Sequence, residues 1–312
     1  MTRASLTELW WIDSFADGFG SQPAHAISLF RVLVAVAILW KIAWEHHWGA
    51  WNYFNTDNYV RWRWEHTNRR YDIIRRRQLP VGTTVYRTLY VIRVVAATCF
   101  LLGVGAQPAA LVLAAWFFFQ ASFERWWHPV YLGCVTLLLA LSPGIDDHFT
   151  LMSSFHVGDV AGPGVDPWPQ LMLMLLVVQM YWSSAYLKAR SPQFRSGAVL
   201  YEMFNHMSQI RRFMPHYEIG YPRVLQRSLI DGDREVISRR WRPAALMTIG
   251  AEFAIPPLLL LPSTYFVAAA VGVVMHAGFT AIWPIRLLPF TIGTVSSYLL
   301  FIDPQQVARV IG

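Results

Sequence analysis

A lysine at the polar end of a long apolar stretch is the first side chain in this sequence that could act as a base. Residues 171–187 read LMLMLLVVQMYWSSAYL, and Lys188 is the first charged residue after them. Pro192 and Gly197 follow, and an amphipathic segment begins near Tyr201. An amine at such a position is either an anchor that reaches the lipid headgroups or a base in an apolar pocket. Since burial disfavours the charged form of lysine, the choice depends on how deeply Lys188 is buried.

Ionisable side chains inside other apolar stretches complete the candidate set. A charged group at the bilayer centre costs at least about 2.5 kcal/mol, so each requires a partner or a function. Glu252 lies in GAEFAIPPLLLL, where Pro256 and Pro257 weaken the helix and free backbone carbonyls. Glu252 either forms a buried ion pair with Arg31 or Arg93, or forms the polar wall of a cofactor pocket.

Two histidines lie in or beside apolar stretches. His276, within VGVVMHAGFTAIW, is either a hydrogen-bonded packing residue or a proton-transfer group, since imidazole titrates near neutral pH. His128, within RWWHPVYLG, precedes a proline at the start of an apolar stretch, and by itself it indicates an interfacial residue. The other histidines have no metal-ligand spacing with acids or cysteines, so we predict no metal site.

The composition indicates a membrane protein. The chain has 312 residues, of which 55% are hydrophobic and 14% are charged, whereas soluble globular chains carry about 25% charged residues. Cys99 and Cys134 lie in apolar runs and are expected to be small buried side chains rather than a disulfide framework. We therefore predict an all-α, polytopic integral membrane bundle.

The apolar runs predict about eight transmembrane helices in a single domain over residues 1–312, with an interfacial helix near 6–15. Segments 45–83 and 188–243 are predicted to be basic interfacial loops, the second with two short interfacial helices. The predicted spans are Ala26–Trp44, Thr84–Leu102, Ala109–Phe123, Val130–Leu141, Gln170–Leu187, Ala244–Leu261, Thr264–Trp283 and Ile285–Phe301.

The basic residues are concentrated in the two loops. The net charge is +7, and 7 of the 26 lysines and arginines lie in 45–83 and 11 in 188–243, while residues 142–169 contain none. The positive-inside rule places both basic loops in the cytoplasm, with both termini outside. We predict a bacterial inner-membrane protein whose basic loops face anionic lipid headgroups. Nucleic-acid binding is not predicted, because the same loops carry interfacial aromatic residues.

Several blocks, in order from Ile27 to Pro304, resemble the HTTM family, the membrane domain shared with vitamin K-dependent gamma-carboxylases. ISLFRVLVAVAILW resembles the opening span, and RVVAATCFLLGVGAQPAALVL resembles the next two. ERWWHPVYLGCVTLLLALSPGIDDHFTLMSSF is similar to a block with a histidine and a later acidic loop. QMYWSSAYLKARSPQFRSG resembles the lysine segment, and AEFAIPPLLLL and VVMHAGFTAI resemble the later glutamate and histidine spans.

The resemblance implies a catalytic set and a chemistry. Lys188 matches a lysine that acts as base on vitamin K hydroquinone, His128 matches a histidine tied to oxygenation, and His276 one in the reduced-quinone pocket. We assign cofactor binding to Glu252, Arg31, Arg93 and Tyr181. The implied cofactor is a reduced quinone of the vitamin K hydroquinone or menaquinol type, with oxygen and carbon dioxide as co-substrates.

The expected function is that of a membrane enzyme whose lysine base on a reduced quinone drives oxygen-dependent deprotonation, carboxylation or oxidation of a peptide or small-molecule substrate. The family has Ala-Gly before the lysine, whereas the residues before Lys188 here are Ser183, Ser184, Ala185, Tyr186 and Leu187. No counterpart of the family's large extramembrane domain is expected after span eight. These departures favour a substrate other than a tethered protein. The alternative is a non-enzymatic quinone- or lipid-binding membrane subunit. The enzyme hypothesis predicts that Lys188, His128 and His276 converge on one apolar cavity.

Overall fold

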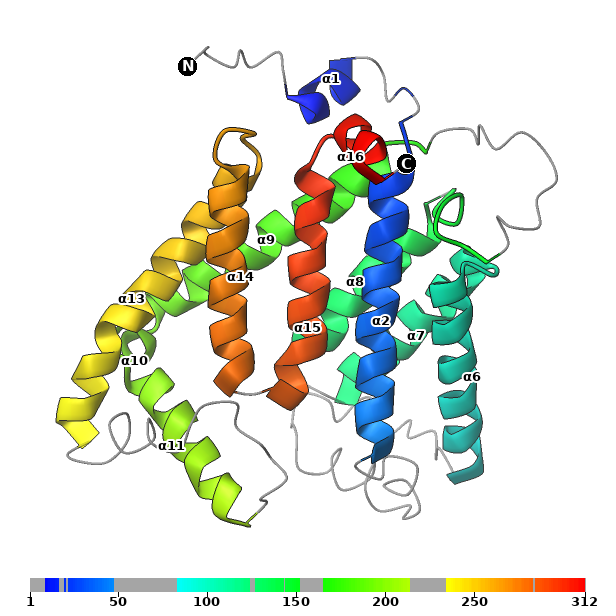
Figure 1. The fold of residues 1–312 in the computed structure, drawn as a ribbon. Helices are drawn as coiled ribbons and strands as arrows, with labels where there is room; N and C mark the ends of the chain where they lie inside the picture. The colour runs from blue at the N-terminus through cyan, green and yellow to red at the C-terminus, as the bar shows by residue number, and fades with distance from the viewer. Residues whose placement is uncertain are drawn as a thin grey trace. The chain divides into compact units, whose positions relative to one another are not determined.

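Helices make up most of the residues that the computed structural model describes. These are residues 9–16, 20, 22–47, 83–123, 127–142, 144–151, 165–213, 234–282 and 284–311. Within them the one β interaction is an isolated bridge between Gln22 and Val165. The predicted all-α class is therefore confirmed (Figure 1).

Most elements follow the apolar runs closely, with ends that differ from the predicted ones by a few residues. The helices are α1 (Trp10–Ala16), α2 (His25–His47), α6 (Thr83–Leu102), α7 (Ala106–Phe123), α8 (Trp127–Ala140), α9 (Trp168–Arg190), α10 (Pro192–Arg195), α11 (Ala198–Phe213), α13 (Arg234–Leu259), α14 (Tyr265–Ile282), α15 (Pro284–Ser296), the 3₁₀ helix η4 (Ser297–Phe301) and α16 (Pro304–Ile311).

Three helices in the described part of the chain are long and apolar enough to cross a membrane. They are α2, Thr84–Leu102 within α6, and α9. Residues Leu287–Phe301 with Pro304–Ile311 would add a fourth, but the chain bends by 104° between them. The predicted number of about eight spans is not confirmed, because a span needs about 20 apolar residues. The apolar stretches of α7, α8 and α14 are shorter than 18 residues. The structure supports an integral membrane protein.

The chain divides into two compact units, and each is described by itself. Unit 2 comprises residues 21–169, in which α2 packs against α6, α6 against α7, and α7 against α8. Gly103 allows the turn between α6 and α7, because its φ of +74° is left-handed and a Cβ there would lie 2.3 Å from Thr150 Cγ2.

Unit 1 comprises residues 1–20 and 170–312. In this unit α14 packs between α13 and α15 (Figure 1). Helix α11 and the short helix α10 pack against α13. Phe194 and Leu200 meet Ala245 and Ile249 in a small buried core. Helices α10 and α11 occupy part of the segment that was predicted to hold two interfacial helices. Residues 214–233 of that segment, and residues 48–82 of the first basic loop, lie outside the described part.

Candidate functional site: a lysine–glutamate pair beside a buried histidine

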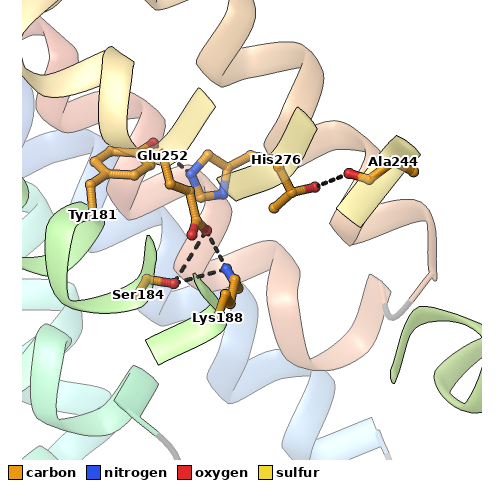
Figure 2. Close-up of polar contacts among 7 residues, drawn as sticks. Tyr181, Ser184, Lys188, Ala244, Glu252 and His276 are labelled. Carbon is orange, nitrogen blue, oxygen red and sulfur yellow. Dashed lines mark hydrogen bonds and ion pairs between the residues drawn. The ribbon is translucent and has the colours of Figure 1, made fainter. Parts of the chain in front are cut away.

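Lys188 is paired with a carboxylate rather than extended toward the headgroups. It lies in the last turn of α9, and its Nζ donates to Glu252 Oε1 of α13 in an ion pair. The same Nζ donates to Ser184 Oγ at 2.8 Å, and Ser184 Oγ donates to Glu252 Oε1 at 3.2 Å. Ser184 is four residues before Lys188, so both point to one face of α9. The amine, hydroxyl and carboxylate therefore form a closed polar triangle (Figure 2).

Aromatic rings surround the charged end of Lys188. Its Nζ lies 5.6 Å from the ring centroid of Phe194 and 5.5 Å from that of Phe279. The Lys188 side chain is 23% exposed and that of Glu252 is 5% exposed. A cation over aromatic faces is stabilised by the ring quadrupoles. The interfacial-anchor interpretation of Lys188 therefore fits this geometry less well than a site role.

One carboxylate oxygen of Glu252 has no partner. Glu252 Oε2 is buried and accepts no hydrogen bond within the described ranges. Buried polar atoms are nearly always hydrogen-bonded, so an exception calls for an explanation. An unpaired carboxylate oxygen can accept a hydrogen bond from a hydroxyl group or take up a proton. Glu252 thus offers a free acceptor beside the Lys188 amine.

Prolines in α13 explain how this helix is attached to α9 at the level of Glu252. Pro256 has no N–H for the carbonyl of Glu252, and Pro257 has none for the carbonyl of Phe253. Trp182 of α9 donates its Nε1 to the Phe253 carbonyl at 3.3 Å. The expected release of carbonyls by the prolines is borne out at Phe253, where the freed carbonyl joins the two helices next to the ion pair.

A second buried polar cluster contains His276. Tyr181 Oη hydrogen-bonds His276 Nε2 at 2.7 Å and also forms a short hydrogen bond with Tyr298 Oη. All three side chains are buried. The centroid of the Phe279 ring is 6.3 Å from that of His276 and 5.5 Å from Lys188 Nζ. The two clusters therefore share one aromatic neighbour, and unit 1 brings Lys188, Glu252, Tyr181 and His276 together (Figure 2).

Arg31 of α2 belongs to unit 2 and does not pair with Glu252. It donates to four backbone carbonyls: from Nη1 to Phe100 and to Leu101 (3.1 Å), and from Nη2 to His148 (3.3 Å) and Phe149 (2.8 Å). Arg31 is fully buried. Its guanidinium ties the end of α6 and the loop after α8 to α2, so the contacts are those of a structural clamp.

Arg93 of α6 also has a different partner from the one proposed from the sequence. Its Nη1 forms an ion pair with Glu45 Oε2 at 2.6 Å, in unit 2. The predicted ion pair of Glu252 with Arg31 or Arg93 was therefore wrong in its partner, which is Lys188. Glu45 was read as the first residue of a loop, whereas it is still part of α2.

Of the three residues that were expected to converge on one cavity, Lys188 and His276 lie in unit 1 and share Phe279 as a neighbour. His128 lies in the first turn of α8, is half-buried, and belongs to unit 2. No group of three or more His, Cys, Asp or Glu side chains that could hold a metal occurs among the described residues.

Sequence reasoning missed Tyr298 and the two aromatic rings beside Lys188. Tyr298 is 117 residues from Tyr181, so no local pattern links them. A signal did exist for Ser184, which lies one turn before Lys188. The glycine at position 272, inside an apolar helix, was a second signal for close packing. The structure shows the reason, because a Cβ at this position would lie 2.1 Å from Tyr298 Oη.

The contact between the Lys188 amine and the Glu252 carboxylate is suited to proton transfer. An amine hydrogen-bonded to a carboxylate in apolar surroundings can pass its proton to that carboxylate and so become a base, because neutralisation removes two poorly solvated charges. No known protein family, curated protein or solved structure matches this chain, so this chemistry rests on the geometry of the site itself.

Proposed function

We propose that the chain is an integral membrane enzyme of the HTTM type, in which Lys188 takes a proton from a reduced quinone dissolved in the bilayer. The observation that carries the proposal is the hydrogen-bonded pair of Lys188 and Glu252, with the amine against Phe194 and Phe279. The spans of the chain and its exposed apolar side chains suit a substrate that arrives through lipid.

The residues present fit a quinol hydroxyl. Glu252 Oε2 is a buried acceptor without a partner in the described part of the chain, and Lys188 is partly accessible. A phenolic O–H can donate to that oxygen while its ring lies against aromatic side chains. A reduced quinone held there would supply two electrons, with dioxygen as the oxidant.

The proton path runs through this chain's own side chains. Lys188 first gives its proton to Glu252, which leaves a neutral amine held by Ser184. As the O–H bond of a quinol held at Glu252 Oε2 breaks, its proton would move to Oε2 while the proton on Oε1 returns to the Lys188 amine. The electron pair of that bond would stay on the quinol oxygen. His276, oriented by Tyr181, lies next to the pair and serves the second proton transfer. Carbon dioxide addition or oxidation of a peptide or small-molecule substrate would use the resulting reactivity.

The test compares two cationic residues at the same end of α9. Arg190 is exposed and hydrogen-bonds the Tyr186 hydroxyl two residues before Lys188, so Arg190→Ala is a matched control for loss of a positive charge. With the protein in lipid nanodiscs, a menaquinol-type quinol and oxygen, Lys188→Ala is expected to lower quinol consumption by about 100-fold or more. Arg190→Ala is expected to keep most of it. Equal turnover in the wild type and in folded Lys188→Ala would contradict the base role.

The second candidate, a non-enzymatic quinone- or lipid-binding subunit, is favoured by one observation. Large apolar side chains on α14 are unusually exposed, among them Phe266 at 80% and Val274 at 71%, which suits a surface for lipid or for a partner helix. A wild-type protein that retains quinone through purification but shows no quinol turnover with oxygen would establish this candidate instead.

The proposal includes an orientation in a bacterial inner membrane with the basic loops in the cytoplasm. Arg240 and Arg242, near the start of α13, are exposed and fall within the second basic segment. We expect an Arg240→Cys variant to react with a membrane-impermeant thiol reagent only after the membrane is opened. Cys99 and Cys134 are partly buried and give the background. Labelling of Arg240→Cys in intact cells would show the opposite orientation, and it would leave the proposed chemistry at Lys188 unaffected.

A further inference from the structure

Arg93 has one hydrogen-bonded edge and one unused edge. It is 1% exposed, and its Nη1 is engaged with Glu45 Oε2. Its Nε and Nη2 are both buried and have no hydrogen-bond partner in the described part of the chain. A buried guanidinium with unsatisfied donors is strongly unfavourable unless something accepts from them.

The two nitrogens without a partner, Nε and Nη2, lie along one edge of the planar guanidinium group. In arginine, the N–H bonds of Nε and Nη2 point in parallel along one edge, a geometry that matches two oxygens bonded to one atom. This is the pairing that arginine makes with carboxylates and phosphates. The free edge of Arg93 is therefore shaped for a bidentate oxyanion and not for a single carbonyl.

Trp116 adds a third unused donor. Its ring centroid lies 5.1 Å from Arg93 Cζ, and its Nε1 is buried without a partner among the described residues. Indole nitrogen is a donor only, so it cannot satisfy Arg93. Three donor nitrogens, two of Arg93 and one of Trp116, thus lack an acceptor within the described part of the chain.

The local charge balance also favours an anion. Glu45 pairs with two cations, since its Oε1 lies 2.5 Å from Lys41 Nζ and its Oε2 contacts Arg93. The three side chains carry one positive charge more than negative. Arg31 in the same unit is equally buried, and its Nε also lacks a partner among the described residues, but both of its terminal nitrogens donate to backbone carbonyls. Because an equally buried arginine of this unit has partners for both terminal nitrogens, burial alone does not explain why Nη2 of Arg93 has none.

We propose that the Nε–Nη2 edge of Arg93, whose guanidinium lies over the Trp116 ring, binds an oxyanion that carries two oxygens on one atom. Carboxylate, bicarbonate and phosphate share this chemistry. Two sources can supply it, a free small anion or the phosphate of a lipid headgroup. The site is in unit 2 and does not depend on the role of Lys188.

The experiment tests for both a bound free anion and a bound phospholipid, using the full-length protein in detergent. Acetate, bicarbonate and inorganic phosphate are titrated against chloride at constant ionic strength, and the unfolding midpoint is followed. Native mass spectrometry of the same preparation detects retained phospholipid. The variants are Arg93→Gln, Arg93→Lys and Trp116→Phe, and Arg309→Gln on exposed α16 is the control.

A free anion as ligand predicts a rise in midpoint with one of the three probes. Arg93→Lys keeps the charge but loses the fork, so its anion affinity is expected to fall by about tenfold or more, with a smaller loss in Trp116→Phe. A lipid source predicts instead a retained phospholipid that is lost in Arg93→Lys. Arg309→Gln should behave as wild type in both arms.

The proposal is overturned if the wild type neither responds to the anions nor retains phospholipid, which would leave water as the occupant of the edge. It is also overturned if Arg93→Lys and Trp116→Phe respond as the wild type does. Arg93→Gln leaves Glu45 with Lys41 alone and risks misfolding, so the decision rests on the two conservative variants.

Discussion

The buried cation Arg31 and the partly buried cation Lys188 are held in opposite ways. Arg31 in unit 2 donates to four backbone carbonyls, two in α6 and two in the loop after α8, and a backbone carbonyl does not take up its proton. Lys188 in unit 1 faces a carboxylate with a spare oxygen, a hydroxyl and two aromatic rings. Both solve the problem of a charge in an apolar bundle, but only the second arrangement can change its protonation. The comparison teaches that the partner of a buried cation, more than its burial, indicates whether the cation is structural or chemical.

Removing Arg31 should have the largest effect on stability. Arg31→Gln leaves most of the four carbonyls without a donor and is expected to reduce the free energy of unfolding by on the order of 4 kcal/mol. Arg31→Lys should recover little, because one ammonium cannot reach all of them. Detergent-induced unfolding followed by tryptophan fluorescence measures the loss. A stable Arg31→Gln protein that has lost only quinol turnover would break the comparison.

Separating Lys188 from Glu252 should have the next largest effect. Glu252→Gln leaves the ammonium without its counter-ion and is expected to cost about 2–4 kcal/mol, at the lower end because Lys188 is 23% exposed. The double variant Lys188→Met with Glu252→Leu should be close to wild type in stability. It should nevertheless be inactive with quinol and oxygen. A double variant as unstable as Glu252→Gln would mean that the pair is mainly structural.

Gly272→Ala tests the chain of hydroxyls that holds His276. The added Cβ would lie 2.1 Å from Tyr298 Oη, so Tyr298 must move from Tyr181. Overpacking of this kind costs about 1–3 kcal/mol. The control is Gly278→Ala in the same helix, where no atom lies within 4 Å of the new Cβ. Its stability should change by less than about 1 kcal/mol. Equal thermal midpoints for the two variants would contradict a tight contact at Tyr298.

The smallest effect should be a pH dependence at the loop that Arg31 clamps. The His148 ring stacks on His25 at 3.8 Å, and burial, followed by the positive charge of His25, lowers the pKa of His148 from 6.5. Burial, followed by the negative charge of Asp146, raises the pKa of Asp147 from 3.8, so the contribution of Asp147 to stability is lost as the pH rises rather than as it falls.

Because the folded protein favours neutral His148, this contribution to stability is present above the unfolded-state pKa near 6.5. It is lost as the pH falls from there through the lower folded-state value. His148→Phe keeps the stacked ring but cannot titrate, and it should flatten the decline of the unfolding midpoint between about pH 7 and pH 5. An unchanged decline would assign it to other groups.

The parts of the fold that were predicted correctly were predicted mainly from the lengths of the apolar runs and the positions of the prolines. The spans at α2, α6 and α9 were predicted within three residues at each end, because long uninterrupted apolar runs have few alternatives in a bilayer. The count of eight was not reached, since a shorter run such as α8 gives the same composition signal without the length. The site was predicted only residue by residue. Lys188, Glu252, His276 and Tyr181 were all named, but which of them meet depends on packing between distant helices.

The hydrogen bond from Trp182 to the Phe253 carbonyl has a mechanical consequence. The prolines remove two successive hydrogen bonds from α13, which makes this the place where the helix would flex as bilayer thickness varies. The indole fastens that weak point to α9 immediately after Glu252. We therefore expect a tilt of α9 to move α13 with it at this level, which would preserve the distance between the Lys188 amine and the Glu252 carboxylate.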